Sequence, residues 1–224
     1  MNRALFYKEW IKIRWFFTAA IIAGVVIELI MFLKLGRSFR FAGHEHLWDV
    51  IVNKHQFMFS MIKYYPICVG VIIGMAQVLP EISRSRLKLS LHLPMKEARV
   101  VAVMAGFGLG LLILLLSVLQ VLMLGGARYY FAGEMVNSVF YTSLPWFMAG
   151  ITAYLLLAFS LYEPIRKRKV VNICTSAFLL YLHFISSFPG AWSGSIWLLL
   201  IMPVISSLFL FYSVYRFKAG VQAS

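Results

Sequence analysis

The sequence has little charge, and very little of it is acidic. Only 13% of the 224 residues are charged, with 8 acidic residues against 21 lysine or arginine residues. Soluble domains are about a quarter charged and about half apolar, whereas 62% of this chain is hydrophobic. Its mean hydropathy is +0.84. A globule of this size cannot bury so much apolar surface. The composition therefore excludes a soluble enzyme or a disordered chain and predicts an all-α integral membrane protein.

Several chemical signatures are missing as well. The two cysteines, Cys68 and Cys174, lie in or beside apolar segments, and no CxxC or Cys/His spacing typical of a zinc site is present. There is no G-x-x-x-x-G-K-[ST] phosphate loop, so we expect no nucleotide-binding domain in this chain. No small-residue cleavage site follows the basic N-terminal segment, and we expect the first apolar run to remain in the protein. We expect no catalytic residue and no cofactor.

Six apolar runs are about long enough to cross the hydrocarbon core of a bilayer. The predicted spans are Trp15–Leu33, Tyr64–Leu79, Val100–Leu124, Phe140–Leu161, Val170–Phe188 and Ile196–Tyr215. They leave almost nothing for a soluble domain, so residues 1–224 are predicted to form a single six-span domain.

The distribution of basic residues predicts the orientation. If the N-terminus is inside, fifteen lysine and arginine residues fall in inner segments and six in outer ones. Cytoplasmic loops of membrane proteins carry this excess, so both termini are predicted to be cytoplasmic. The net charge of +13 is thereby explained by the membrane, and we expect the lipid bilayer, not nucleic acid, as the partner of these charges.

The segment 1–14 has the pattern of an amphipathic helix. Ala4, Leu5, Trp10, Ile11 and Trp15 can share one side, while two lysines one turn apart lie elsewhere. Such a helix lies in the plane of the membrane interface. A simple basic flank before the first span is the alternative.

The inner segment between the second and third spans is the most informative one. Pro80 is predicted to end or kink the second span, and Pro94 closes the segment. The residues between them are apolar on one side and basic on the other, with Leu87 and Leu91 as i, i+4 neighbours. A short charged helix between two spans is suited to docking on a cytoplasmic protein.

This segment resembles the ABC-2-type permeases, the membrane subunits of one class of ABC exporters. In that family the second and third spans are joined by a stretch close to E-x-x-x-G-T-L-E-x-L-L-x-x-P, and Glu81, Leu87, Leu91 and Pro94 fall in register with it. The chain departs from it with Ser85 for glycine, Arg86 for threonine and Lys88 for the second acid. The resemblance implies a cytoplasmic coupling helix over residues 81–94 that docks on a separate ATPase.

The resemblance also implies the partners. The assembly would contain two ATPase subunits, which hold the ATP and magnesium, and a second permease copy or paralogue, in a prokaryotic inner membrane. This chain would then be a non-catalytic permease subunit forming half of an export pathway. The residues implied in coupling to the ATPase are Glu81, Arg84, Arg86, Leu87, Lys88, Leu91 and Pro94.

Four polar residues within the predicted spans are candidates for the pathway. Glu28 lies inside the first span, where a carboxylate is expensive and is a functional candidate by default. Pairing with a basic group near the outer end of the span, such as Lys34, or simple protonation, is the alternative. Gln77, Gln120 and His183 are milder cases, for which an interhelical hydrogen bond is the favoured interpretation.

Two further function classes stay open. The predicted outer loop 34–63 contains His44 and His46, which are candidate metal ligands, although a solvated loop is favoured. Ser193 in a Ser-Gly turn suggests a serine hydrolase, but no histidine follows it to act as the base. A membrane-embedded enzyme or a non-transporting membrane scaffold are therefore the alternatives to the permease.

Overall fold

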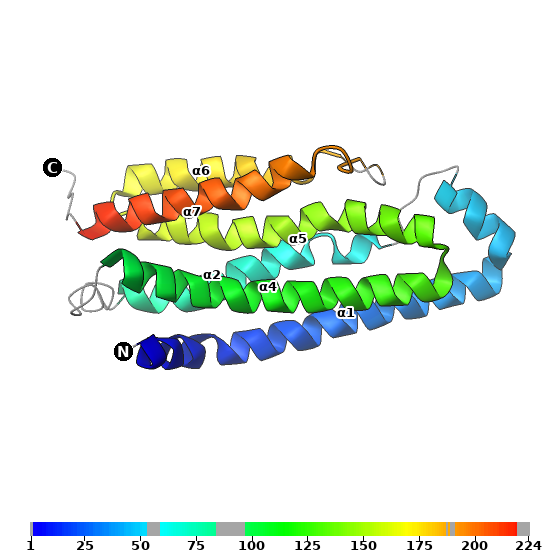
Figure 1. The fold of residues 1–224 in the computed structure, drawn as a ribbon, viewed down its shortest axis with the longest axis horizontal. Coiled ribbons are helices and arrows are strands. Elements are labelled where there is room, and N and C mark those ends of the chain that lie inside the picture. Colours follow the sequence, from blue (N-terminus) through cyan, green and yellow to red (C-terminus); the bar gives the residue numbers. More distant parts are fainter. Residues whose placement is uncertain (1, 53–58, 84–96, 187, 189–190, 219–224) are drawn as a thin grey trace.

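The structure is a computed structural model. It describes residues 2–52, 59–83, 97–186, 188 and 191–218. The helices are α1 (Asn2–Val52), α2 (Tyr65–Ser83), α4 (Glu97–Tyr130), α5 (Gly133–Tyr162), α6 (Arg166–Leu182) and α7 (Ile196–Lys218), with a 3₁₀ turn, η1 (Ser60–Ile62), before α2. They form one elongated antiparallel bundle (Figure 1). The prediction of an all-α protein is confirmed for this described part.

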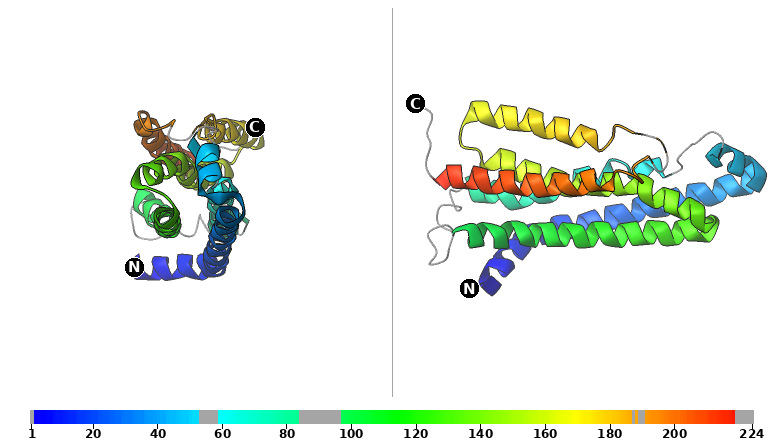
Figure 2. Two further views of the ribbon diagram at one scale, coloured as in Figure 1. Left: turned by 90° about the vertical axis from the view of Figure 1, so that its right-hand side faces the viewer. Right: turned by 45° about the horizontal axis from the view of Figure 1, so that its top comes forward.

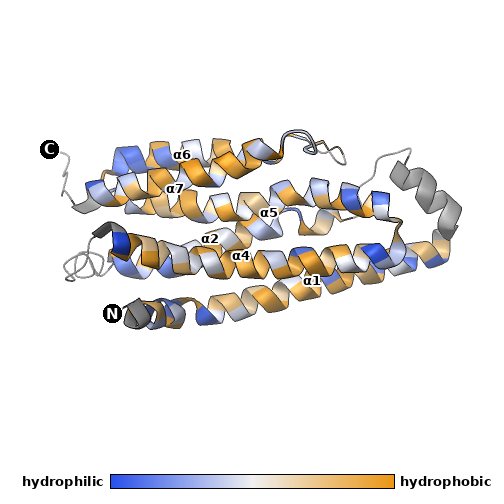
Figure 3. Cartoon of the chain, viewed as in Figure 1, coloured by the Kyte–Doolittle hydropathy of each residue, from blue (hydrophilic) through white to orange (hydrophobic). Residues whose placement is uncertain are grey.

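Successive helices run in alternating directions along the bundle, so that α1 begins and α7 ends at the same end (Figure 1). The first residues of α6 at this end are the basic run Arg166–Lys169, and Figure 3 shows hydrophilic residues at the ends of the helices. Apolar residues occupy most of their length. This arrangement is the one expected when both termini lie on one side of a membrane.

Five helical segments are long and apolar enough to cross a membrane: Leu5–Phe41, Ser60–Ser83, Arg99–Tyr130, Gly133–Tyr162 and Ile196–Arg216. They correspond to five of the predicted spans. The remaining prediction, Val170–Phe188, coincides with α6, which has 17 residues and ends at Leu182. Its length of about 25 Å is less than the 30 Å or so of a hydrocarbon core. The sixth span therefore stays a prediction.

The predicted outer loop 34–63 is wrong over residues 34–52, because α1 continues as a helix to Val52. No proline interrupts this stretch, and contacts between aromatic rings hold this part of α1 against the bundle. The ring of Phe39 stacks on Tyr130 of α4 at a centroid distance of 5.5 Å, and Phe32 stacks on the same tyrosine at 6.3 Å. Aromatic pairs of this kind stabilise by about 0.5–1.5 kcal/mol each.

The segment 1–14 is the beginning of α1, without a break in the helix. Its first turns run across the bundle instead of along it (Figure 2). Trp10, Ile11 and Trp15 are exposed, as an interfacial helix requires, but Leu5 is buried. The predicted apolar side is therefore divided between the surroundings and the bundle.

The helices α2 and α5 form the centre of the bundle, and their backbones approach closely. A Cβ atom on Gly70 would collide with the backbone of Gly150, and one on Gly150 would lie 2.6 Å from the carbonyl oxygen of Pro66. Small residues bring helices together in membranes because packing, not water exclusion, drives their association. The Gly70–Gly74 motif of the sequence thus serves packing within the chain.

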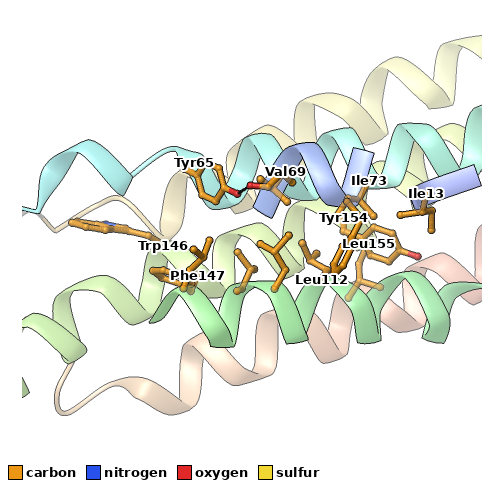
Figure 4. Close-up of a cluster of buried hydrophobic side chains, with 14 of the residues drawn as sticks. Ile13, Tyr65, Val69, Ile73, Leu112, Trp146, Phe147, Tyr154 and Leu155 are labelled. Carbon is orange, nitrogen blue, oxygen red and sulfur yellow. Dashed lines mark hydrogen bonds between the residues drawn. The ribbon is translucent and has the colours of Figure 1, made fainter. Parts of the chain in front are cut away.

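Pro80 does not end α2, which continues to Ser83. The side chains around this helix, including Tyr65, Val69 and Ile73, pack against Tyr154, Leu155 and Leu112 from α5 and α4 in the core (Figure 4). The helix thus continues past Pro80 to include Glu81, which is buried.

Candidate functional site

A buried ionic cluster lies where the N-terminal turns of α1 meet the end of α2. We define the cluster as Lys8, Glu9 and Lys12 of α1 and Glu81 of α2. The three α1 residues share one side of the helix because Lys12 lies about one turn after both Lys8 and Glu9. The crossing of the first turns over the bundle (Figure 2) brings that side onto α2.

The cluster is held by short ionic contacts. The Nζ atom of Lys12 donates to Oε1 of Glu9 at 2.6 Å and to Oε1 of Glu81 at 2.5 Å. The Nζ atom of Lys8 lies 2.9 Å from the same oxygen of Glu81. Both carboxylates are 0% exposed. Two ammonium groups thus balance two carboxylates, which is the condition for burying charge without a large penalty.

A neutral network extends the cluster into the core. The Nε2 atom of Gln77 donates to Oε2 of Glu9 at 2.9 Å and to the carbonyl of Met104 at 2.6 Å. The hydroxyl of Tyr154 donates to Oε1 of Gln77 at 2.7 Å and approaches the carbonyl of Ala105 at 3.1 Å. Gln77 was predicted to make an interhelical hydrogen bond, and it does. Four helices, α1, α2, α4 and α5, are joined in this way.

Some buried oxygen atoms at this end of the bundle have no hydrogen-bond partner among the described residues. Oε2 of Glu81 and Oε1 of Glu163 are buried without a hydrogen-bond partner among the described residues. A cavity of about 10 Å³ between Gln77, Tyr154 and Tyr162 adjoins the network, which is about the space of one water molecule. The charges of the cluster therefore sum to zero, but one of its buried carboxylate oxygens accepts no hydrogen bond from the described residues.

A second ion pair closes the same end of the bundle between α5 and α7. The Nη1 atom of Arg216 lies 3.1 Å from Oε2 of Glu163, and the arginine also stacks over the ring of Tyr212 at 5.8 Å. Neither residue was singled out from the sequence, because a charge at a helix end gives no sign of its partner.

Glu28 is 4% exposed, and its Oε1 atom has no partner among the described residues. The proposed pairing with Lys34 is not found, since the Nζ atom of Lys34 contacts the sulfur of Met61 at 3.8 Å. Glu28 is therefore a buried polar group that does not pair with Lys34, and its role in the pathway stays a prediction.

Gln120 and His183 make interhelical contacts, as favoured from the sequence. The Nε2 atom of Gln120 donates to Oγ of Ser143 at 2.8 Å. His183 is 1% exposed, and its Nε2 atom lies 3.5 Å from Oγ1 of Thr152. Its Nδ1 atom lies 3.3 Å from the carbonyl of Leu179, and within the described part no hydrogen bond joins it to Ser193.

The remaining predicted residues cannot be placed. Of the coupling segment 81–94, only Glu81 to Ser83 belong to the described residues. Arg84, Arg86, Leu87, Lys88, Leu91 and Pro94 lie outside them. The side chains of His44 and His46 lie outside the described ones too. The described residues contain no group of three metal-binding side chains.

Comparison with known proteins does not identify the chain: no family model, no curated protein and no solved structure matches it. Its assignment to the class of multi-pass helical membrane proteins accordingly depends on its long apolar helices.

Proposed function

We propose that this chain is the permease subunit of an ATP-driven ABC-2-type exporter in a prokaryotic inner membrane. It forms half of the translocation pathway and pairs with a second permease. ATP is hydrolysed on two separate ATPase subunits. The proposal begins from the resemblance of residues 81–94 to the family's coupling segment.

The observation that carries the proposal is the position of Glu81. It is the first residue of the coupling motif, and its carboxylate is bound by Lys8 and Lys12 of the N-terminal segment. Through Glu9 and Gln77 the same contacts reach α4 and α5. A displacement of the coupling segment would thus move four helices together instead of bending one loop.

Glu81 therefore has a different role from the docking residues that follow it. Because its side chain is fully buried within the chain, it positions the coupling segment, and Leu87 and Leu91 supply the apolar surface that meets the ATPase. Energy would arrive mechanically, as closure of the ATPase pair shifts the docked segments and the spans move as rigid bodies.

The first experiment is purification of the tagged protein from its native membrane in mild detergent, followed by mass spectrometry. A stoichiometric subunit with a phosphate-binding loop is the expected result. The same preparation also shows whether the second permease is a copy or a paralogue. A single species without an ATPase, reproduced in nanodiscs, would overturn the proposal in favour of a membrane enzyme or a scaffold.

Coupling is then tested by substitution of the docking surface. L87D/L91D should abolish permease-stimulated ATP hydrolysis while the protein still inserts and folds. The matched control is K167D at the exposed start of α6, which changes the net charge by the same amount but lies outside the coupling motif and the predicted spans. Hydrolysis that survives in L87D/L91D at the level of the control would contradict the assignment of the coupling segment.

A further inference from the structure

An apolar groove between α1 and α2 lies outside the ionic cluster but ends at it. The groove has a volume of about 810 Å³. On α1 it is lined by Phe16 and three small residues, and on α2 by residues between Tyr65 and Pro80. Of the described residues that line it, Lys12 alone carries a charge. The groove is thus apolar along its length and cationic at one end.

The dimensions of the groove fit one leaflet of a membrane. Along α1 it runs from Lys12 to Ala23, a rise of about 16 Å. Half of a hydrocarbon core is about 15 Å. Small side chains, Ala19, Ala20 and Ala23, form the α1 wall and leave room for an extended alkyl chain. A chain seated in the groove would lie parallel to the lipids around it.

The charges at the open end of the groove favour an anionic headgroup. Glu9 and Glu81 are 0% exposed, whereas the side chain of Lys8 is 33% exposed and that of Lys12 is 10% exposed. Lys8 lies one turn before Lys12 on α1, on the side of the helix that lines the groove. A ligand approaching from the membrane surface therefore meets cations, because the carboxylates that balance them face the protein.

We propose that this groove binds one anionic glycerophospholipid, with an acyl chain between α1 and α2 and its phosphate at Lys12 and Lys8. The lipid would hold the N-terminal segment against α2 from the membrane side, as the ionic cluster does from within. The proposal depends on the predicted cytoplasmic position of this end but not on the identity of the protein as a permease.

The test is native mass spectrometry of delipidated protein titrated with phosphatidylglycerol or with phosphatidylcholine of the same acyl chains. Phosphatidylglycerol should bind at least about fivefold more tightly, since each basic residue near a headgroup contributes about 1 kcal/mol. K8Q should reduce this preference, whereas R168Q at the exposed start of α6 should not. Equal binding of the two lipids would overturn the proposal.

The position of the lipid is tested by filling the groove. A19W places an indole in it and should remove the bound lipid, whereas I22W, on the same helix but outside the lining, should keep it. If A19W instead abolishes a dimer and leaves the lipid adduct, the groove is an interface with a second copy and the proposal is wrong.

The unmodified protein offers a second readout that needs no substitution. Cys68 lines the groove and is exposed, and Cys174 on α6 is exposed elsewhere. Phosphatidylglycerol should slow maleimide labelling of Cys68 relative to that of Cys174, as measured by peptide mass spectrometry. Labelling of Cys68 at an unchanged relative rate, under conditions where the lipid adduct is present, would show that the lipid binds elsewhere.

Discussion

The substitution of Lys12 by methionine probes the ionic cluster most directly. The ammonium of Lys12 bonds to both buried carboxylates. In K12M, two carboxylates, Glu9 and Glu81, would share one ammonium group among the described residues, that of Lys8. Removing one partner of a buried ion pair costs about 3–5 kcal/mol, because the remaining charge is uncompensated. For a chain of this length that corresponds to a loss of about 10 °C in melting temperature.

The measurement is thermal unfolding in one fixed detergent, followed by tryptophan fluorescence, for the wild type, E9Q, K12M, E9Q/K12M and K167M. In E9Q/K12M the pair between Lys8 and Glu81 remains, and the new glutamine can still accept the hydrogen bond from Gln77. This double variant should therefore be more stable than K12M alone. K167M removes an exposed charge on α6 and should change stability by less than about 0.5 kcal/mol.

Two results would refute this reasoning. If K12M is no less stable than K167M, the lysine is not a necessary partner of buried carboxylates. If the effects of E9Q and K12M simply add, the two residues do not interact, since interacting residues show coupling of about 0.5–3 kcal/mol.

Three other substitutions test the packing and polar groups of the bundle. G70A should destabilise by at least about 2 kcal/mol because its methyl group collides with the backbone of α5, while G106A, where nothing lies within 4 Å, should be neutral or slightly stabilising; thermal unfolding compares the two. Y154F should cost about 1–3 kcal/mol by leaving a buried amide oxygen unsatisfied, and Y181F, at an exposed site, should cost nothing measurable in the same assay. E28Q should change stability by less than about 1 kcal/mol, because a buried carboxyl without a cation neutralises instead of carrying charge; peptide mass spectrometry should then find dicyclohexylcarbodiimide on Glu28 in the wild type, and its absence there would show that the carboxyl is ionised.

The long apolar helices were predictable because the membrane imposes their length and composition. Four predicted spans agree with apolar helical segments of the structure to within several residues at each end, and the first lies inside the longer segment Leu5–Phe41. The continuation of α1 to Val52 was missed because the hydropathy of a segment tells whether it lies in the membrane, not whether it is helical. Phe32 and Phe39 hold this continuation through ring contacts with Tyr130. Because Tyr130 follows them by more than ninety positions in the sequence, no local pattern indicates these contacts.

It was predictable that buried polar side chains form hydrogen bonds between helices, but not which residues they bond to. Buried amides in a span need hydrogen bonds, so interhelical bonds for Gln77 and Gln120 followed from their position alone. Glu9 was overlooked, since an acid between two lysines in a short basic helix looks like a solvated side chain. Its role depends on Gln77, 68 positions away, and becomes visible only when the helices are packed.

The N-terminal segment shows why periodicity alone could not orient this part of the chain. In water, the apolar side of an amphipathic helix turns toward the protein. At a membrane surface both the lipid and the protein can accept apolar side chains, so the polar side decides the orientation. Here Glu9 and Lys12 face inward because the bundle supplies their partners, and Trp10 and Trp15 are exposed, where aromatic residues are stable at an interface. The segment is then held on two sides, by ion pairs to the end of α2 and by the membrane. A movement of Glu81 must therefore either carry the segment along or break buried ion pairs, and the cost of breaking them favours movement as one body.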